Sequence, residues 1–223
     1  MTRVADQPGI VLHTRPYRES SLILSVLTLD FGVVSLIAKG VRGKRTGRSL
    51  QPFTVLRLGW TGRSNLVTLG GFEVEKQFWF QGNKLASAFY LAELTTRLLG
   101  EREAHPRLYV GLQWALNSLD SSPSRILRSF EKLLLEELGY GLDFKRDVDG
   151  ESLMEGTAYR LVHDRGFIKD AAGIDGSLLQ AIGNESFDSP DVRNAAKRVL
   201  GEALATHLGP RPLLSRRLLV SSG

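Results

Sequence analysis

The residues best suited to chemistry form a dense run of cations, KGVRGKRTGRS, at positions 39–49. Its first ten residues include three glycines, no acid and five basic residues, which are Lys39, Arg42, Lys44, Arg45 and Arg48. Guanidinium and ammonium groups bind phosphate through charge-assisted hydrogen bonds. The run therefore indicates a loop that holds a polyanion, and its structural alternative is a charged turn that only faces solvent.

A nucleotide-binding loop does not fit the spacing. The phosphate-binding motif needs four residues between its glycines, then Lys followed by Ser or Thr, and it opens a helix. Gly43 and Gly47 are separated by three residues, Arg48 stands in place of the lysine, and a strand-like segment follows. Glycines in such a loop instead allow backbone amides to approach a phosphate and leave the arginines mobile.

The excess positive charge of the chain is concentrated around this run. The net charge is +5, but residues 1–80 hold 11 Lys and Arg against 5 Asp and Glu, whereas residues 81–223 hold 18 against 19. No acid occurs between Asp30 and Glu73, and a field of one sign attracts polyanions. The predicted polyanion-binding residues are Lys39, Arg42, Lys44, Arg45, Arg48, Arg57 and Arg63.

Aromatic residues in the same region could stack on nucleic-acid bases. They are Phe31, Phe53, Trp60, Phe72 and Trp79. A small domain needs its large side chains inside, so the sequence favours the core for each of them.

Catalytic chemistry is not expected. The chain has no cysteine, no G-x-S-x-G elbow and no H-E-x-x-H motif, and its four histidines are dispersed. The acids Asp143, Asp147, Asp149 and Glu151 lack the spacing of a calcium-binding loop and indicate a solvated acidic loop. We therefore predict no enzyme activity, no catalytic residue, no metal site and no cofactor. A membrane association is not expected either, because no apolar run approaches the roughly 18 residues of a membrane span.

Five short segments rich in aliphatic and β-branched residues fill the first 80 residues, each bounded by turn residues. They are residues 9–16, 21–30, 33–41, 54–60 and 66–76. The Gly70-Gly71 pair in the last segment indicates a bulge. Five strands without an intervening helix favour a small, closed or nearly closed β-barrel.

Helical periodicity begins near residue 83. It predicts helices near residues 83–99, 105–119, 123–138 and 190–208, with Ser122 and Ser189 as N-caps. Residues 140–168 are first acidic and irregular and then predict two short strands around a turn at 163–166. The expected fold class is α+β, with an N-terminal barrel at 1–80. A mainly helical domain follows at 81–223, interrupted by a small β element at about 140–170.

A second group of cations lies on the third predicted helix. Arg125, Arg128 and Lys132 follow one another at one-turn spacing, beside the apolar Phe130 and Leu134. One interpretation is a solvated face on which these cations pair with nearby glutamates. The other is a basic-edged apolar groove for a short acidic peptide that ends in aromatic or apolar residues.

Several segments together resemble the RecO family of bacterial recombinational-repair proteins. They are GIVLHTRPYRESSLILSVLTLDFGVVSLIAKGVRGKRT, LQPFTVLRLGW, LRSFEKLLLEELGYGLDF and GPRPLLSRRLL, in that order from about Ile10 to Leu219. The combination of LIAKGVRG, the following QPF and the LGYG after a long helix is specific, whereas each alone is weak.

The resemblance implies an N-terminal OB-fold, binding of single- and double-stranded DNA, and annealing of complementary strands. It implies as partners the acidic tail of single-stranded DNA-binding protein and RecR, with which the protein helps to load RecA. It places the family's basic loop on Arg42, Lys44 and Arg45, and its tail-binding cation on Arg128. A cytoplasmic, nucleoid-associated location follows. Some relatives carry four cysteines that form a zinc site after LGYG, and this chain has none.

Two rival functions remain open on the residues alone. A basic OB-fold could bind structured RNA or the ribosome, and a protein-only adaptor could use its basic face to meet an acidic partner.

Overall fold

The computed structural model describes residues 3–220, and the chain folds into two compact units. The first runs to Asp120 and also takes the C-terminal segment from Leu213, and the second spans Ser121–Pro212. The boundary that we expected near residue 80 therefore lies inside the first unit, and separate folding of residues 1–80 stays a prediction.

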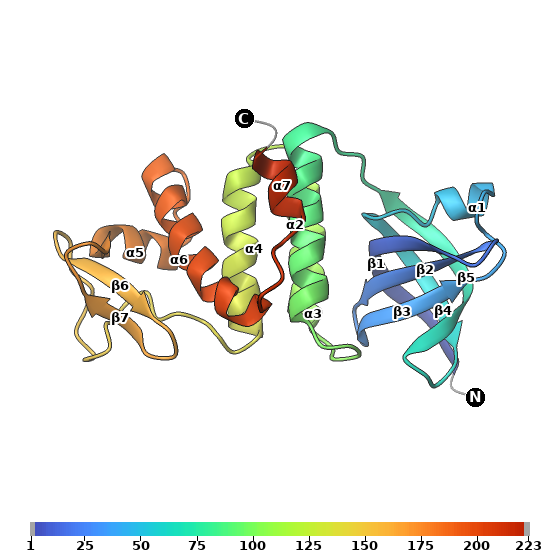
Figure 1. Ribbon diagram of the computed structural model, residues 1–223, viewed down its shortest axis with the longest axis horizontal. Coiled ribbons are helices and arrows are strands. Elements are labelled where there is room, and N and C mark those ends of the chain that lie inside the picture. The colour runs from blue at the N-terminus through green and yellow to red at the C-terminus, as the bar shows by residue number, and fades with distance from the viewer. Residues whose placement is uncertain (1–2, 221–223) are drawn as a thin grey trace. The chain divides into compact units, whose positions relative to one another are not determined.

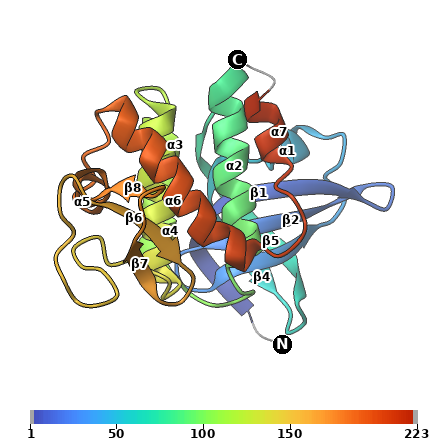
Figure 2. The same cartoon turned by 60° about the vertical axis from the view of Figure 1, so that its left-hand side comes forward.

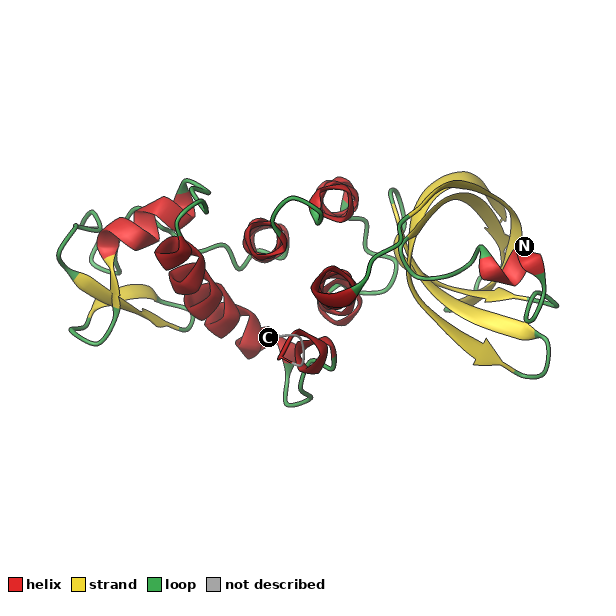
Figure 3. Ribbon diagram, turned by 90° about the horizontal axis from the view of Figure 1, so that it is seen from above, coloured by secondary structure: helices red, strands yellow, loops and turns green. Residues whose placement is uncertain are grey.

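The five predicted strands are confirmed. They are β1 (Arg3–Tyr17), β2 (Ser21–Thr28), β3 (Gly32–Ala38), β4 (Thr54–Thr61) and β5 (Leu66–Gln77). They hydrogen-bond in the order β1-β2-β3-β5-β4, and β1 also pairs with β4, so the sheet closes into a barrel (Figure 3). The β3–β5 pairing is parallel and the others are antiparallel.

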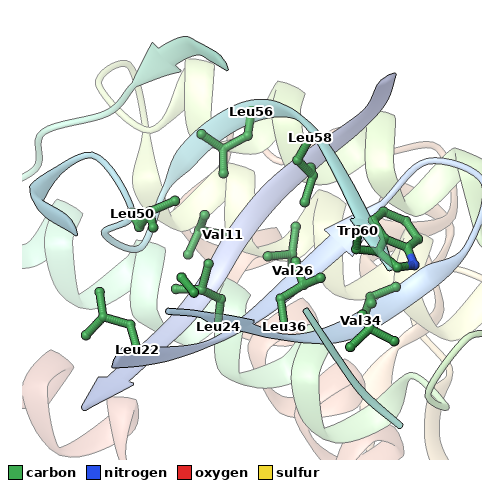
Figure 4. Packing of buried hydrophobic residues seen from close by; sticks show 12 residues of the cluster. Val11, Leu22, Leu24, Val26, Val34, Leu36, Leu50, Leu56, Leu58 and Trp60 are labelled. Atoms are coloured by element: carbon green, nitrogen blue, oxygen red, sulfur yellow. The ribbon is translucent and has the colours of Figure 1, made fainter. Parts of the chain in front are cut away.

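Alternating apolar residues fill the barrel (Figure 4). Val26, Leu58 and Trp60 are examples, each no more than 5% exposed. Gly9 lies close beside them: a Cβ there would be 2.6 Å from Leu58 Cδ2, so this side chain would have to shift. The predicted bulge at Gly70-Gly71 is confirmed, since the β4–β5 register shifts between the Leu58–Phe72 and Trp60–Leu69 pairs.

Three helices of six or more residues belong to the same unit as the barrel. They are α2 (Gly82–Leu98), α3 (Pro106–Ser118) and α7 (Ser215–Val220), and α2 contacts both β1 and α7. Apolar residues on the outside of the barrel, such as Ile10, Leu12 and Leu27, are at most 2% exposed. β1 and β2 are therefore apolar on both faces where they pack, so their sequences alternate only in part.

The second unit combines helices with a three-stranded sheet (Figures 1 and 2). Its elements are α4 (Pro123–Glu137), β6 (Ala158–Val162), β7 (Gly166–Lys169), β8 (Ile174–Asp175), α5 (Gly176–Gly183) and α6 (Pro190–Leu208). The sheet order is β7-β6-β8, and α6 packs against α4, α5 and β6. The β6–β7 hairpin and the Ser189 cap were predicted correctly. The Ser122 side chain, in contrast, accepts no capping hydrogen bond.

The acidic segment after α4 is not simply a solvated loop. Asp147 is 7% exposed, and its Oδ1 accepts hydrogen bonds of 3.0 Å from the backbone N–H groups of Asp149 and Glu151. Asp143 similarly accepts from the N–H groups of Lys145 and Arg146. These carboxylates hold turns of a cysteine-free segment, and no group of three acids or histidines among residues 3–220 has a metal-binding arrangement.

Asp147→Ala is expected to destabilise the second unit by about 1–2 kcal/mol, because it removes a buried carboxylate that accepts two hydrogen bonds from the turn backbone. Thermal or urea unfolding measures this loss of stability. Asp149→Ala is the matched control, since Asp149 is exposed and should change stability by less than about 0.5 kcal/mol. Equal effects of the two substitutions would show that the Asp147 hydrogen bonds do not hold the turn.

Candidate nucleic-acid interface

Most of the predicted basic residues gather at one end of the barrel. This end is defined by the register: Tyr17 pairs with Ser21, Leu22 with Ala38, and Thr54 with Gln77. The connection from β3 to β4, residues 39–53, lies here beside the β1–β2 turn. The Arg42 N–H donates to the Ser20 carbonyl (2.9 Å), and the Arg42 guanidinium donates to the Arg18 carbonyl (3.1 Å). The two connections therefore form one surface.

The connection is anchored to the barrel through its backbone, and the mobility of its arginine side chains stays a prediction. Residues Arg45–Arg48 form a short helix, α1. Within α1, Gly47 is buried, and a Cβ there would collide with the Val41 carbonyl oxygen. Leu50 is fully buried in the barrel core, and its carbonyl accepts a 2.6 Å hydrogen bond from the Thr14 hydroxyl. The sequence suggested flexibility from its glycines, but the packing of Gly47 and Leu50 fixes the backbone.

The cations of this end point into solvent. We call this set the basic end; its members are Arg18, Lys39, Arg42, Lys44, Arg45 and Arg48, and all six are exposed. None of them forms an ion pair with a carboxylate in the part of the chain that the structure describes. Arg18 was missed at the sequence level, because only the strand pairing places the β1–β2 turn against the 39–49 segment. A cluster of unneutralised cations on anchored backbone is suited to binding several phosphates at once.

Arg57 and Arg63 lie elsewhere. Arg57 is in the middle of β4, where its Nε and Nη2 donate to the two Asp6 carboxylate oxygens at 2.7 and 2.6 Å. These hydrogen bonds hold the pKa of Asp6 below its usual range. Glu75 lies 3.8 Å from the same guanidinium, so the charge of Arg57 is largely compensated. Arg63 is in the β4–β5 turn, at the opposite end of the barrel from the basic end.

The aromatic candidates for base stacking differ in how far they are exposed. Trp60 and Phe53 are buried, as the sequence favoured, and Phe72 is half-buried against the barrel core. Phe31 is 37% exposed and makes an edge-to-face contact with Trp60 at 5.3 Å. Trp79 is 79% exposed, against the core placement that the sequence favoured.

The second candidate group, on α4, does not form an open apolar groove. Phe130 and Leu134 are at most 1% exposed and belong to the core. Arg128 is 7% exposed, and its Nη2 donates a 2.8 Å hydrogen bond to the fully buried Glu131. Arg128 is thus neither on a solvated face nor open to a peptide in this structure.

The other two cations of α4 form ion pairs, and the Lys132 side chain is only 13% exposed. Arg125 forms a 2.9 Å ion pair with Asp188, and Lys132 forms ion pairs with Glu136 (2.9 Å) and Glu185 (3.1 Å). Burial lowers the pKa of Lys132, but its two glutamate partners outweigh this and the net shift is upward. A hollow of about 600 Å³ lies beside Lys132 and is also lined by Leu142 and Lys145. Glu136 and Asp143 also line the hollow, so it carries both charge signs, and a peptide-binding site on this unit stays a prediction.

Comparisons with family models and with curated relatives point to one protein family. The model described as "Recombination protein O N terminal" matches residues 1–78, and "Recombination protein O C terminal" matches residues 80–217. The chain belongs to the RecO family. It is 42% identical to a DNA repair protein RecO of Nitrosococcus oceani, over 97% of this chain and 93% of the relative. It is 41% identical to one of Vibrio cholerae, over 95% and 92% of the two chains.

Membership assigns the chain to a family of DNA repair and recombination, as the quoted motifs predicted. A RecO relative from Cellvibrio japonicus, 36% identical, covers 97% of both chains, so the likeness is not confined to the barrel. Among residues 3–220, none of the helices has both the length and the apolarity that crossing a membrane requires.

Proposed function

We propose that this RecO-family chain is a non-enzymatic mediator that binds single- and double-stranded DNA and anneals complementary strands. The observation that carries the proposal is the basic end, where six exposed cations without carboxylate partners are held on anchored backbone. The strand order of the barrel fits an OB-fold, in which the β1–β2 connection takes part in binding oligonucleotides.

The mechanism follows from electrostatics. Two complementary strands repel each other through their phosphates, and this repulsion opposes the first base pairs. A surface that neutralises phosphates of both strands, with release of their counterions, lowers that barrier without chemistry. The neutralised Arg57 lies outside the surface that carries this function.

The partners are proposed from the family. They are single-stranded DNA-binding protein through its acidic tail, RecR, and indirectly RecA, which the protein would help to load at the nucleoid in the cytoplasm.

The direct test is annealing of complementary oligonucleotides, measured by energy transfer between end labels. The chain is expected to accelerate annealing of naked strands and of strands covered by single-stranded DNA-binding protein. Absence of acceleration on both substrates would contradict the proposal. Preference for RNA over DNA of equal length in competition would favour an RNA-binding function, and absence of all nucleic-acid binding at low salt would favour a protein-only adaptor.

A further inference from the structure

Trp79 is the most exposed of the large apolar side chains in the described part of the chain, at 79%. It lies in the connection between β5 and α2, within the sequence Phe78-Trp79-Phe80. Isolated exposed apolar residues are common on protein surfaces, so exposure alone does not indicate function. The surroundings of this tryptophan give the additional evidence.

The connection is held in place on both sides of Trp79. The rings of Phe78 and Phe80 lie parallel at 5.9 Å, and Phe80 contacts the edge of the buried Phe53 at the same distance. The Phe78 N–H donates to the Phe53 carbonyl (3.2 Å), and the Lys76 ammonium lies 4.6 Å from the Phe78 ring. Since both neighbours are packed, the Trp79 indole is presented to solvent from a fixed backbone.

Trp79 also lies at the barrel end that carries the cations. Gln77, two residues before it, pairs with Thr54, and the basic 39–53 connection ends at Phe53, whose carbonyl accepts from Phe78. Figure 1 draws α1 at the upper right of the barrel and the start of the β5–α2 connection at its upper left, on the side of α2. The 39–53 connection thus links the cations of the basic end to the backbone that presents an exposed indole.

We propose that Trp79 is a stacking platform for an unpaired base of single-stranded DNA bound at the basic end. The inference rests on the proposed DNA binding and adds a residue that distinguishes the two DNA forms. Every base has a π-face, so stacking on tryptophan is tolerant of sequence. In a duplex these faces are covered by neighbouring base pairs, whereas the phosphates stay available. Trp79 thus contributes to binding of single strands and not of duplexes.

The test compares Trp79→Ala and Trp79→Phe with Trp114→Ala in the full chain. Trp114 is the matched control, because it is 46% exposed but lies on α3 and not in a connection at the basic end. Trp79→Ala should weaken binding of a 30-nucleotide oligo(dT) about tenfold, within the range for loss of one base stack. Its duplex affinity and the slope of log K against log salt should not change, because no charge is removed. Trp79→Phe should keep most of the affinity, and Trp114→Ala all of it.

Quenching of tryptophan fluorescence by oligo(dT) gives a second readout, which Trp79→Phe should lose and Trp114→Phe should keep. If Trp79→Ala bound oligo(dT) as tightly as the wild type, while charge reversal at the basic end abolished binding, the stacking role would be overturned. The proposed DNA binding would stand. Equal loss on oligo(dT) and duplex would also overturn the stacking role. If the wild-type chain bound no oligo(dT), the proposed function would fail together with the inference.

Discussion

Replacing Arg42, Lys44 and Arg45 together by Glu is expected to abolish DNA binding while the far-UV circular dichroism stays unchanged. All three side chains are exposed and have no carboxylate partner among the described residues, so their reversal removes attraction and adds repulsion. If the wild-type chain contacts about five phosphates, its affinity for single strands should fall roughly a hundredfold between 50 and 200 mM salt. Fluorescence anisotropy over a salt series measures both effects.

Two controls separate local charge from net charge and from loop structure. Arg146, Arg165 and Lys197, which are exposed residues of the second unit, can be changed to Glu with the same change in net charge. This variant should keep most of the affinity and an unaltered salt slope. Because Arg42 also hydrogen-bonds to the β1–β2 turn, the Lys44→Glu, Arg45→Glu pair tests charge without loss of that anchor. Binding by the triple variant at an unchanged salt slope would mean that these cations do not contact DNA.

The sequence predicted the strands and the long helices well because each carries a local signal. The five strands are runs of aliphatic residues between turns, and the α4 and α6 helices have clear apolar periodicity. Elements without such a signal were missed. The α1 helix is four residues long and contains glycine, and β8 has only two residues, so both depend on their surroundings.

The candidate site shows the same limit more sharply. Charge density in the sequence identified five cations of the basic end, but Arg18 joins them only through the pairing of β1 with β2. Arg57 shared the acid-free stretch of sequence, yet the pairing of β1 with β4 brings Asp6 to it from 51 residues away. Linear charge counts cannot see such neutralisation across strands. Likewise, the periodicity of apolar residues on a helix does not tell whether the basic residues beside them face solvent. Arg128 was expected beside such an apolar stripe, and it is buried.

Burial of Arg128 changes what its substitution should do. Arg128→Ala removes one charged partner of Glu131, a carboxylate that is fully buried, and breaking a buried pair in this way costs about 3–5 kcal/mol. We therefore expect a large fall in the urea midpoint of unfolding. Arg125→Ala on the same helix is the matched control. Its ion pair with Asp188 is solvent-exposed, so the expected loss is at most about 1 kcal/mol.

A double variant distinguishes structural from partner-binding loss. Arg128→Met combined with Glu131→Leu removes both buried charges and should recover most of the stability lost by Arg128→Ala. If Arg128 only holds the helix, this variant should bind the acidic tail peptide of single-stranded DNA-binding protein as the wild type does, in calorimetric titration. A folded double variant that loses peptide binding but keeps DNA binding would instead show that the Arg128 guanidinium itself contacts the peptide. Stability of Arg128→Ala equal to that of Arg125→Ala would contradict the buried pair on which this reasoning depends.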